Sequence, residues 1–527
     1  MLALAPLLIL ATPVVWHDAA VKLDVAAQRF DVTDTVTLPG DTTTAELVLH
    51  AGLAPRLVGK STAGSLTKVG PMDAAVPAER WRVTLPVAGR VIELSYGGVI
   101  AHAPAQVATE YQRSFQETPG VIGKDRVFLS IAALWLPRLA VDGKPVGELV
   151  TTKLKVTGMP AGWRALSEGE AAGDNAWTSV TPCDGAHLIA GPFVEHKERI
   201  EGTDVLVWLR SDDAALAQRY LDVTGQYLKM YGGLVGPYPY PKLAVVENFW
   251  ETGYGMASFT LLGSQVIRFP FILHTSYPHE ILHNWWGNGV FVADEGGNWS
   301  EGLTAYLSDH LNAEQQGRGV EYRRTTLQKY QDFVTDAADF PLAGFTGRFS
   351  SASEAVGYGK WLMVVHMLRQ KLGERGFTDA LKTLWKEHRF DKASFADVRA
   401  AFQTQTKEDL GPFFDAWVGR AGAPRVRLRE VAQQRTKDGT LTLKVVIEQT
   451  QRAAPFPLEV PVIVTTLDGK GIKTTVPLQG RTGTAEIKLG VPAARVDVDP
   501  FIDTFRTLLD GETAPSLSRA LGARAMT

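Results

Sequence analysis

The residues best suited to chemistry are two histidines on either side of a glutamate, in His279-Glu280-Ile281-Leu282-His283. On a helix, residues four positions apart lie on the same face, about one turn from each other. Both imidazoles can therefore reach one Zn²⁺ ion at roughly 2.0–2.1 Å. Glu280 is rotated away from this face, so we expect it to accept the proton of an attacking water. Trp285 and Trp286 are expected to continue the same apolar helix.

A second acid, Glu301, follows His283 after seventeen residues, in Asn298-Trp299-Ser300-Glu301-Gly302. We expect it on a helical run from Glu301 to Leu311, where it would be the third metal ligand. Three protein ligands and one open position are typical of catalytic zinc sites. The alternative is a chance motif whose histidines only pack, but the chain has only eleven histidines. The spacing therefore favours one catalytic zinc ion and predicts a zinc peptidase.

The composition is that of a soluble multidomain protein. A chain of 527 residues is too long for one hydrophobic core. Its 54 basic and 57 acidic residues give a net charge of −3 without long runs of one sign, which argues against nucleic acid as a partner. The single cysteine, Cys183, excludes an intrachain disulfide and a thiolate zinc cluster. No pattern in the sequence indicates an oligomeric state.

The start of the chain resembles a secretory signal. Residues 2–11 form an apolar run that is too short to span a bilayer, and Ala11 is a suitable cleavage residue. We therefore expect residues 1–19 to be a signal segment and the protein to be exported to the periplasm or beyond. No Lys or Arg precedes the run, so a buried first strand of a cytoplasmic protein is the alternative. No other stretch is long and apolar enough to predict a membrane span.

The patterning along the chain predicts a multidomain α+β protein. Short alternating runs with Gly and Pro between them predict an all-β domain over 20–207. The period then becomes helical over 208–422, and a small β-sandwich is expected over 423–505, followed by a tail at 506–527. Within the helical part, a strand is predicted at Leu243–Glu247. Helices are predicted at Ala214–Tyr231, Lys360–Leu372, Phe377–Glu387 and Phe395–Thr404.

These motifs resemble those of the gluzincin aminopeptidases, the family of aminopeptidase N and leukotriene hydrolase. His279, Glu280, His283 and Glu301 match the family's metal motif, with an interval one residue shorter than usual. The segments that resemble its other motifs are Trp285-Trp286-Gly287-Asn288, Pro237-Tyr238-Pro239-Tyr240 and Tyr358-Gly359-Lys360-Trp361, where Trp361 replaces a glycine. The resemblance implies a thermolysin-like, mainly helical zinc peptidase domain. It also implies that Tyr358 is a catalytic residue that donates a hydrogen bond to the developing oxyanion, a contact worth about 3–4 kcal/mol.

One departure from the family concerns substrate recognition. The family carries Gly-x-Met-Glu-Asn before the metal helix, and its Glu binds the free amine of the substrate. Aligned on Met256, this chain has Ala257 in place of that Glu and Ser258 in place of the Asn. A methyl group cannot pair with an ammonium group, and the lost bond would cost roughly 1.5–3 kcal/mol. The backbone of Gly255 and Met256 can still pair with an extended peptide, so residues 255–257 are the predicted substrate-binding segment.

Three functions are compatible with these patterns. The first is a zinc peptidase of peptide or protein substrates whose recognition of the N-terminal amine is altered. The second is an ordinary aminopeptidase whose amine anchor is another acid, for which Glu247, Glu251 and Glu354 are the candidates. The third is a zinc-containing peptide-binding protein without turnover. Glu280 and Tyr358 argue against the third function, because a protein without turnover needs no base beside an open metal site, and Ala257 favours the first.

Overall fold

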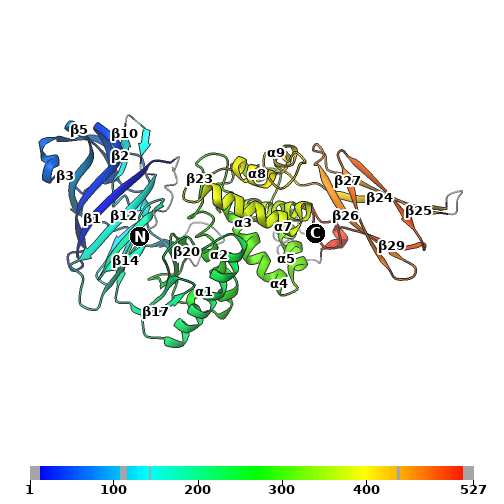
Figure 1. Ribbon diagram of the computed structural model, residues 1–527, viewed down its shortest axis with the longest axis horizontal. Coiled ribbons are helices and arrows are strands. Elements are labelled where there is room, and N and C mark those ends of the chain that lie inside the picture. Colours follow the sequence, from blue (N-terminus) through cyan, green and yellow to red (C-terminus); the bar gives the residue numbers. More distant parts are fainter. Residues whose placement is uncertain (1–11, 107–115, 142–143, 147, 436–439, 514–527) are drawn as a thin grey trace, which may run out of the picture. The chain divides into compact units, whose positions relative to one another are not determined.

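The computed structural model describes residues 12–106, 116–141, 144–146, 148–435 and 440–513 (Figure 1). The chain forms two compact units. Unit 1 consists of Met1–Phe291 and His388–Lys392, and unit 2 of Val292–Glu387 and Ala393–Thr527. Most of the predicted signal segment, residues 1–11, lies outside the described residues, so signal and export stay predictions. No helix among the described residues combines the length and the apolar character needed to cross a membrane.

The N-terminal part of unit 1 is a large sheet whose central strand is β1 (Val14–Asp24). This strand pairs in parallel with β12 (Leu149–Thr157) and antiparallel with the long strand β2 (Arg29–His50). Alternate residues of β1 are buried, as expected for a strand with one face on a core. Because β1 starts at Val14, the folded domain begins before residue 20. The other described strands of this sheet are β3 (Arg56–Leu57), β4 (Ser65–Met72), β5 (Ala78–Gly98), β10 (Arg138–Val141), β11 (Lys144–Val146), β14 (Glu170–Gly173) and β15 (Ala176–Cys183).

Two smaller sheets complete this β-rich part of the chain. One contains β13 (Arg164–Leu166), β16 (Leu188–Gly191), β9 (Val127–Leu129) and β8 (Gly120–Ile122), in that order. The other pairs β6 (Ala105–Gln106) with β7 (Gln116–Glu117). The prediction of many short strands before residue 207 is thus confirmed.

Unit 1 also contains the sheet that leads to the predicted metal motif. Its strand order is β17 (Val194–Ile200), β18 (Thr203–Leu209), β19 (Lys242–Glu247), β21 (Phe259–Leu262) and β20 (Gly253–Met256). Helix α1 (Ala214–Leu234) connects the parallel strands β18 and β19, and it begins at the N-cap Asp213, which accepts the Leu216 N–H at 2.9 Å. The predicted helix at 214–231 is confirmed. Strand β20 lies at the outer edge of the sheet, shortly before α2 (Ser276–Leu282).

The first part of unit 2 is mainly helical. Its described helices are α3 (Ser300–Ala305), α4 (Leu311–Gln315), α5 (Gly319–Phe333), α6 (Ser351–Glu354), α7 (Trp361–His388), α8 (Phe395–Gln403) and α9 (Gly411–Trp417). Two π-helical segments interrupt this set, η6 (Tyr306–His310) and η8 (Ala355–Lys360). Helix α7 bends at Gly373, whose φ of 72° is left-handed, and this bend separates the two helices predicted there.

The last part of unit 2 is a pair of three-stranded sheets. One contains β24 (Val426–Arg435), β25 (Leu441–Gln449) and β28 (Thr482–Leu489), and the other β27 (Gly471–Leu478), β26 (Leu458–Thr466) and β29 (Ala493–Val498). The fold continues beyond residue 505, because the buried Arg506 pairs with Asp499 at 2.8 Å and with Glu512 at 2.7 Å. Residues 514–527 of the predicted tail lie outside the described residues. The predicted fold class, with β, helical and β parts in that order, is confirmed.

Candidate metal centre

The two histidines of the motif lie at the C-terminal end of α2, as their spacing predicts. His279 is within the helix, and His283 follows its last residue with helical backbone angles (φ −57°, ψ −19°). Their ring centroids are 4.8 Å apart, and the ring planes meet at 76°. The other face of the helix is held in the core by Tyr277, Ile281 and Leu282, which are fully buried. The packing of this apolar face therefore turns both imidazoles to the same side.

The helix is shorter than the sequence predicted. It ends at Leu282, and the chain then turns, so Trp285 and Trp286 do not continue it. Both indoles are fully buried, and a buried apolar side chain gives the same sequence pattern in a turn as in a helix. The turn also brings the Trp286 carbonyl oxygen to 2.9 Å from His283 Nδ1. A hydrogen bond donated from Nδ1 leaves the lone pair on Nε2, the tautomer that a metal ligand needs.

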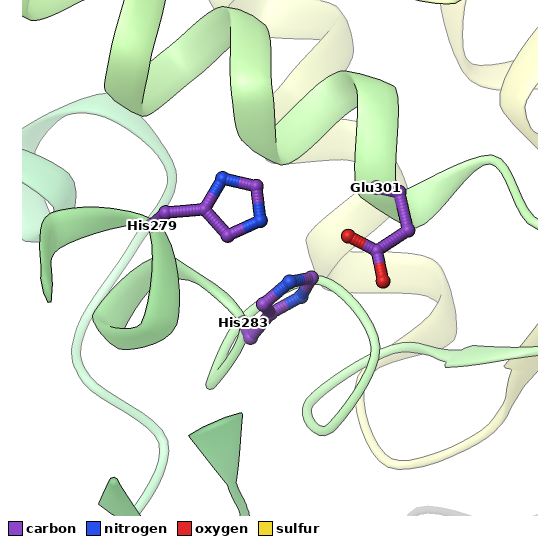
Figure 2. Close-up of side chains that lie close together, drawn as sticks. All are labelled: His279, His283 and Glu301. Carbon is purple, nitrogen blue, oxygen red and sulfur yellow. The ribbon is translucent and has the colours of Figure 1, made fainter. Parts of the chain in front are cut away.

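Glu301 completes a group of three possible ligands. One ligand atom from each of His279, His283 and Glu301 lies within 4.8 Å of the other two, and all three residues are half-buried. Figure 2 shows the imidazoles and the carboxylate directed toward a common space. In the described part of the chain, no other cluster of three or more His, Cys, Asp or Glu residues has this geometry. Two imidazoles and one carboxylate are a donor set of catalytic zinc sites, so the residues fit this ion.

Tryptophans fix the segment that carries Glu301. Trp299 donates its indole N–H to the Ala393 carbonyl at 2.7 Å, and Trp361 donates to the Trp299 carbonyl at 2.9 Å. Glu301 then stands in the first turn of α3, where the helix dipole favours a negative charge. Trp361, which departs from the family's motif, is fully buried. The departure thus has a clear structural role, because it supports the backbone next to the predicted ligand.

Glu280 lies beside the edge strand β20. A Cβ atom added to Gly255 would be 2.8 Å from Glu280 Oε2 and 3.0 Å from the Glu280 carbonyl oxygen. The absence of a side chain at Gly255 therefore allows the strand to pass close to the predicted base. Asn288 also donates from Nδ2 to the Gly255 carbonyl at 3.3 Å. The structure brings Gly255 and Glu280 together, and it adds Asn288 to them.

Ala257 does not stand in an open binding site. It belongs to a two-residue turn between β20 and β21, since Met256 pairs with Phe259. The side chain is 3% exposed and lies in a buried apolar cluster with Cys183 and Tyr240. Met256 is likewise buried, in the neighbouring core. Within the predicted substrate-binding segment, Gly255 closely approaches a predicted catalytic residue, Glu280.

The first alternative amine anchor already binds a cation. Glu247 is buried, pairs with Arg268 at 2.7 Å and accepts the Arg210 N–H at 2.9 Å. Burial alone would raise the pKa of this carboxyl, but the hydrogen bonds from Arg268 and Arg210 outweigh it and hold the pKa below its usual value. Glu247 is therefore committed to a structural ion pair.

The other two acids are engaged as well. Glu251 accepts the backbone N–H groups of Gln265 at 3.0 Å and of Val266 at 3.3 Å, and so holds the turn that follows β21. Glu354 lies 3.5 Å from the Lys329 ammonium. These contacts do not favour either residue as an amine anchor.

Tyr358 lies in the π-helical segment η8, next to the helix that carries Glu301. A Cβ atom added to Gly302 would be only 2.7 Å from the Gly357 carbonyl oxygen, so the backbones of α3 and η8 are in close contact. The Tyr358 ring packs edge to face on Phe345, with centroids 5.9 Å apart. A π-helical segment is frequent at functional sites because it shifts one side chain out of the regular helical spacing.

The comparisons with known proteins define the class of protein. Residues 274–417 match the model of the peptidase family M1 domain. These residues are thus similar to the peptidase family M1 domain, and the predicted resemblance to the gluzincin aminopeptidases is confirmed. The matched range contains all three possible ligands, Glu280 and Tyr358.

Individual relatives share little sequence identity with this chain. The chain is 21% identical to tricorn protease-interacting factor F2 of Thermoplasma volcanium over 292 residues, which are 48% of this chain and 35% of the relative. It is 24% identical to aminopeptidase M1-C of Oryza sativa over 249 residues, 44% of this chain and 28% of the relative. The chain thus spans about a third of the length of these relatives. An M1 zinc metallopeptidase from Deinococcus radiodurans has the same fold, with a TM-score of 0.56 and 20% identity over 76% of this chain and 93% of that one.

Proposed function

We propose that this chain is a zinc metallopeptidase that hydrolyses peptide bonds and recognises the substrate's N-terminal amine differently from its relatives. The observation that carries the proposal is the convergence of His279, His283 and Glu301 beside an acid, Glu280, that is not one of the three. The match to the peptidase family M1 domain supports it. The three converging residues would hold one zinc ion.

The proposed chemistry divides between the ion and the side chains. Zinc, when bound, supplies a Lewis acid that polarises the scissile carbonyl and lowers the pKa of water toward about 7. Glu280 accepts a proton from the attacking water and then returns it to the leaving amine. Tyr358 donates a hydrogen bond to the oxyanion, a contribution of about 3–4 kcal/mol. The Trp286 carbonyl keeps the His283 ring oriented throughout.

The substrate would bind as an additional strand beside β20. Strand β20 is at the edge of its sheet, and an extended peptide can pair with the backbone of an edge strand without any particular side chain. Such pairing would place the peptide next to Glu280, because Gly255 touches this residue. Ala257 offers no carboxylate for a free amine, and Glu247 is already paired with Arg268. We therefore propose that the enzyme cleaves blocked or longer peptides.

The test is to compare one set of peptides with free and with acetylated N-termini, using Glu280→Gln as the blank. Cleavage of both forms supports the proposal. Stepwise cleavage of free N-termini alone would show an ordinary aminopeptidase whose amine anchor is another acid. Zinc binding without cleavage of either form would instead favour a peptide-binding protein.

A further inference from the structure

The turn between β20 and β21 holds a serine in an unusual conformation. Ser258 has a φ of 70°, in the left-handed region that favours glycine, and its side chain is fully buried. A non-glycine residue in such a strained conformation persists only where its surroundings fix it. The contacts of Ser258 therefore indicate what holds this end of β20.

All three polar groups of Ser258 are bound within unit 1. Its N–H donates to Asn284 Oδ1 at 2.8 Å, and its carbonyl accepts the Ala244 N–H at 3.0 Å. Its hydroxyl oxygen accepts from Lys242 Nζ at 2.9 Å and from the Gly169 N–H at 3.3 Å. The turn is thus fixed by two side chains from other elements, Lys242 and Asn284.

Lys242 is an unusual residue to bury. Its side chain is 1% exposed, and Nζ donates to the Ser167 carbonyl at 2.8 Å besides the Ser258 hydroxyl. The ammonium group also lies over the rings of Trp177 and Phe259, at 4.9 Å and 5.3 Å from their centroids. Burial lowers the pKa of Lys242 to about 7, although the nearby Glu168 and Cys183 favour the charged form. Burying an amine costs free energy unless the amine is hydrogen-bonded, and the bonds to Ser167 and Ser258 offset this cost.

Asn284 connects the same turn to the metal helix. It directly follows His283, is fully buried, and donates from Nδ2 to the Ile281 carbonyl at 3.0 Å. Its Oδ1 accepts from Ser258 and also from the Tyr238 hydroxyl at 3.1 Å. A displacement of the turn would therefore change the distance between β20 and α2, where Gly255 leaves no spare room beside Glu280.

We propose that Lys242 and Asn284, acting through Ser258, are positioning residues that hold the edge strand β20 at the correct distance from Glu280. This inference rests on the proposed function, in which β20 binds the substrate. Neither residue touches the reacting atoms in this account. Their effect is expected in the affinity for extended peptides rather than in metal binding.

The test measures KM, kcat and zinc content for the Lys242→Met and Ser258→Ala variants, together with the Kd of an acetylated peptide in a Glu280→Gln background. Losing the hydrogen bond from Lys242 Nζ is expected to raise KM and Kd roughly tenfold, with one zinc per chain retained. Ser258→Ala removes the hydroxyl but keeps the strained backbone, so it is expected to act in the same direction. The matched control is Ser61→Ala, which removes another buried hydroxyl. Ser61 lies in the 3-10 helix Gly59–Ala63, and its hydroxyl accepts the N–H of Glu93 on β5 at 2.9 Å.

A rescue experiment separates positioning from general destabilisation. Glycine adopts a φ of 70° without strain, so Ser258→Gly should need no support from Lys242. The double variant Lys242→Met with Ser258→Gly is expected to bind peptide more tightly than Lys242→Met alone. Wild-type values of KM and Kd in both Lys242→Met and Ser258→Ala would overturn the inference. A wild-type protein that neither binds zinc nor cleaves peptides would instead refute the proposed function itself.

Discussion

Replacing Gly255 by alanine places a methyl group against the proposed general base. The new Cβ would lie 2.8 Å from Glu280 Oε2, 3.0 Å from the Glu280 carbonyl oxygen and 3.4 Å from its Cα. Ordinary van der Waals contacts of a Cβ atom lie at 3.4–4 Å, so an overlap of roughly 0.4–0.6 Å with the two oxygens must be relieved. The carboxylate can rotate, but the carbonyl belongs to the backbone of α2. The strand or the base must therefore move.

The expected consequence is a loss of turnover with the metal retained. A misplacement of about 1 Å at a reacting group can reduce the rate 100-fold, so kcat should fall by about 10- to 100-fold in Gly255→Ala. Gly253→Ala in the same strand is the matched control, because a Cβ atom there meets nothing within 4 Å. The assay compares kcat on an acetylated peptide with zinc content for both variants. Equal kcat in Gly255→Ala and Gly253→Ala would refute the proposed contact between β20 and the base.

Three further predictions concern stability and the metal. Ala257→Glu would bury a carboxylate beside Cys183 and Tyr240, so we expect urea unfolding to show a loss of about 3 kcal/mol in the free energy of unfolding. Peptide cleavage by this variant should show no gain in preference for free N-termini. Burial, aided by the charge of Arg323, lowers the pKa of His310 from 6.5 to about 2. Below pH 6.5, His310 therefore binds a proton in the unfolded protein but stays neutral in the folded protein. The contribution of His310 to the free energy of unfolding should therefore be fully present above pH 6.5 and fall by about 1.4 kcal/mol per pH unit below it. Urea unfolding at several pH values should show that the free energy of unfolding depends less steeply on pH in His310→Gln than in the wild type. Removal of zinc by a chelator should lower Tm and abolish cleavage, and added zinc should restore both; an unchanged Tm would speak against a metal bound to the folded state.

The metal motif could be predicted from the sequence because its two histidines are close together in the chain. His279 and His283 are on one helix, and their spacing alone places both rings on one face. Glu301 was identified from the motif around it, and its proximity to the histidines required the fold. Long periodic elements such as α1 were predicted for the same reason, since their pattern is repeated over several turns.

What could not be predicted depends on contacts between distant segments. The sequence aligned Ala257 with an amine-binding residue but gave no sign that Cys183 would bury it. Asn284 follows the motif directly, yet only the fold shows that it binds the turn at Ser258. The sequence does not predict the end of α2 at Leu282, because a buried tryptophan gives the same apolar pattern in a helix as in the turn after it. The π-helical segment around Tyr358 likewise leaves no periodic signal.

We propose that one zinc ion and Glu280 together hydrolyse the peptide bond. The most direct measurement is the zinc content and the peptide turnover of Glu280→Gln beside the wild-type protein. We expect one zinc per chain in both proteins, because Glu280 is not among the three converging ligands, and almost no turnover in the variant. Turnover equal to that of the wild type, or loss of zinc from the variant, would contradict this account.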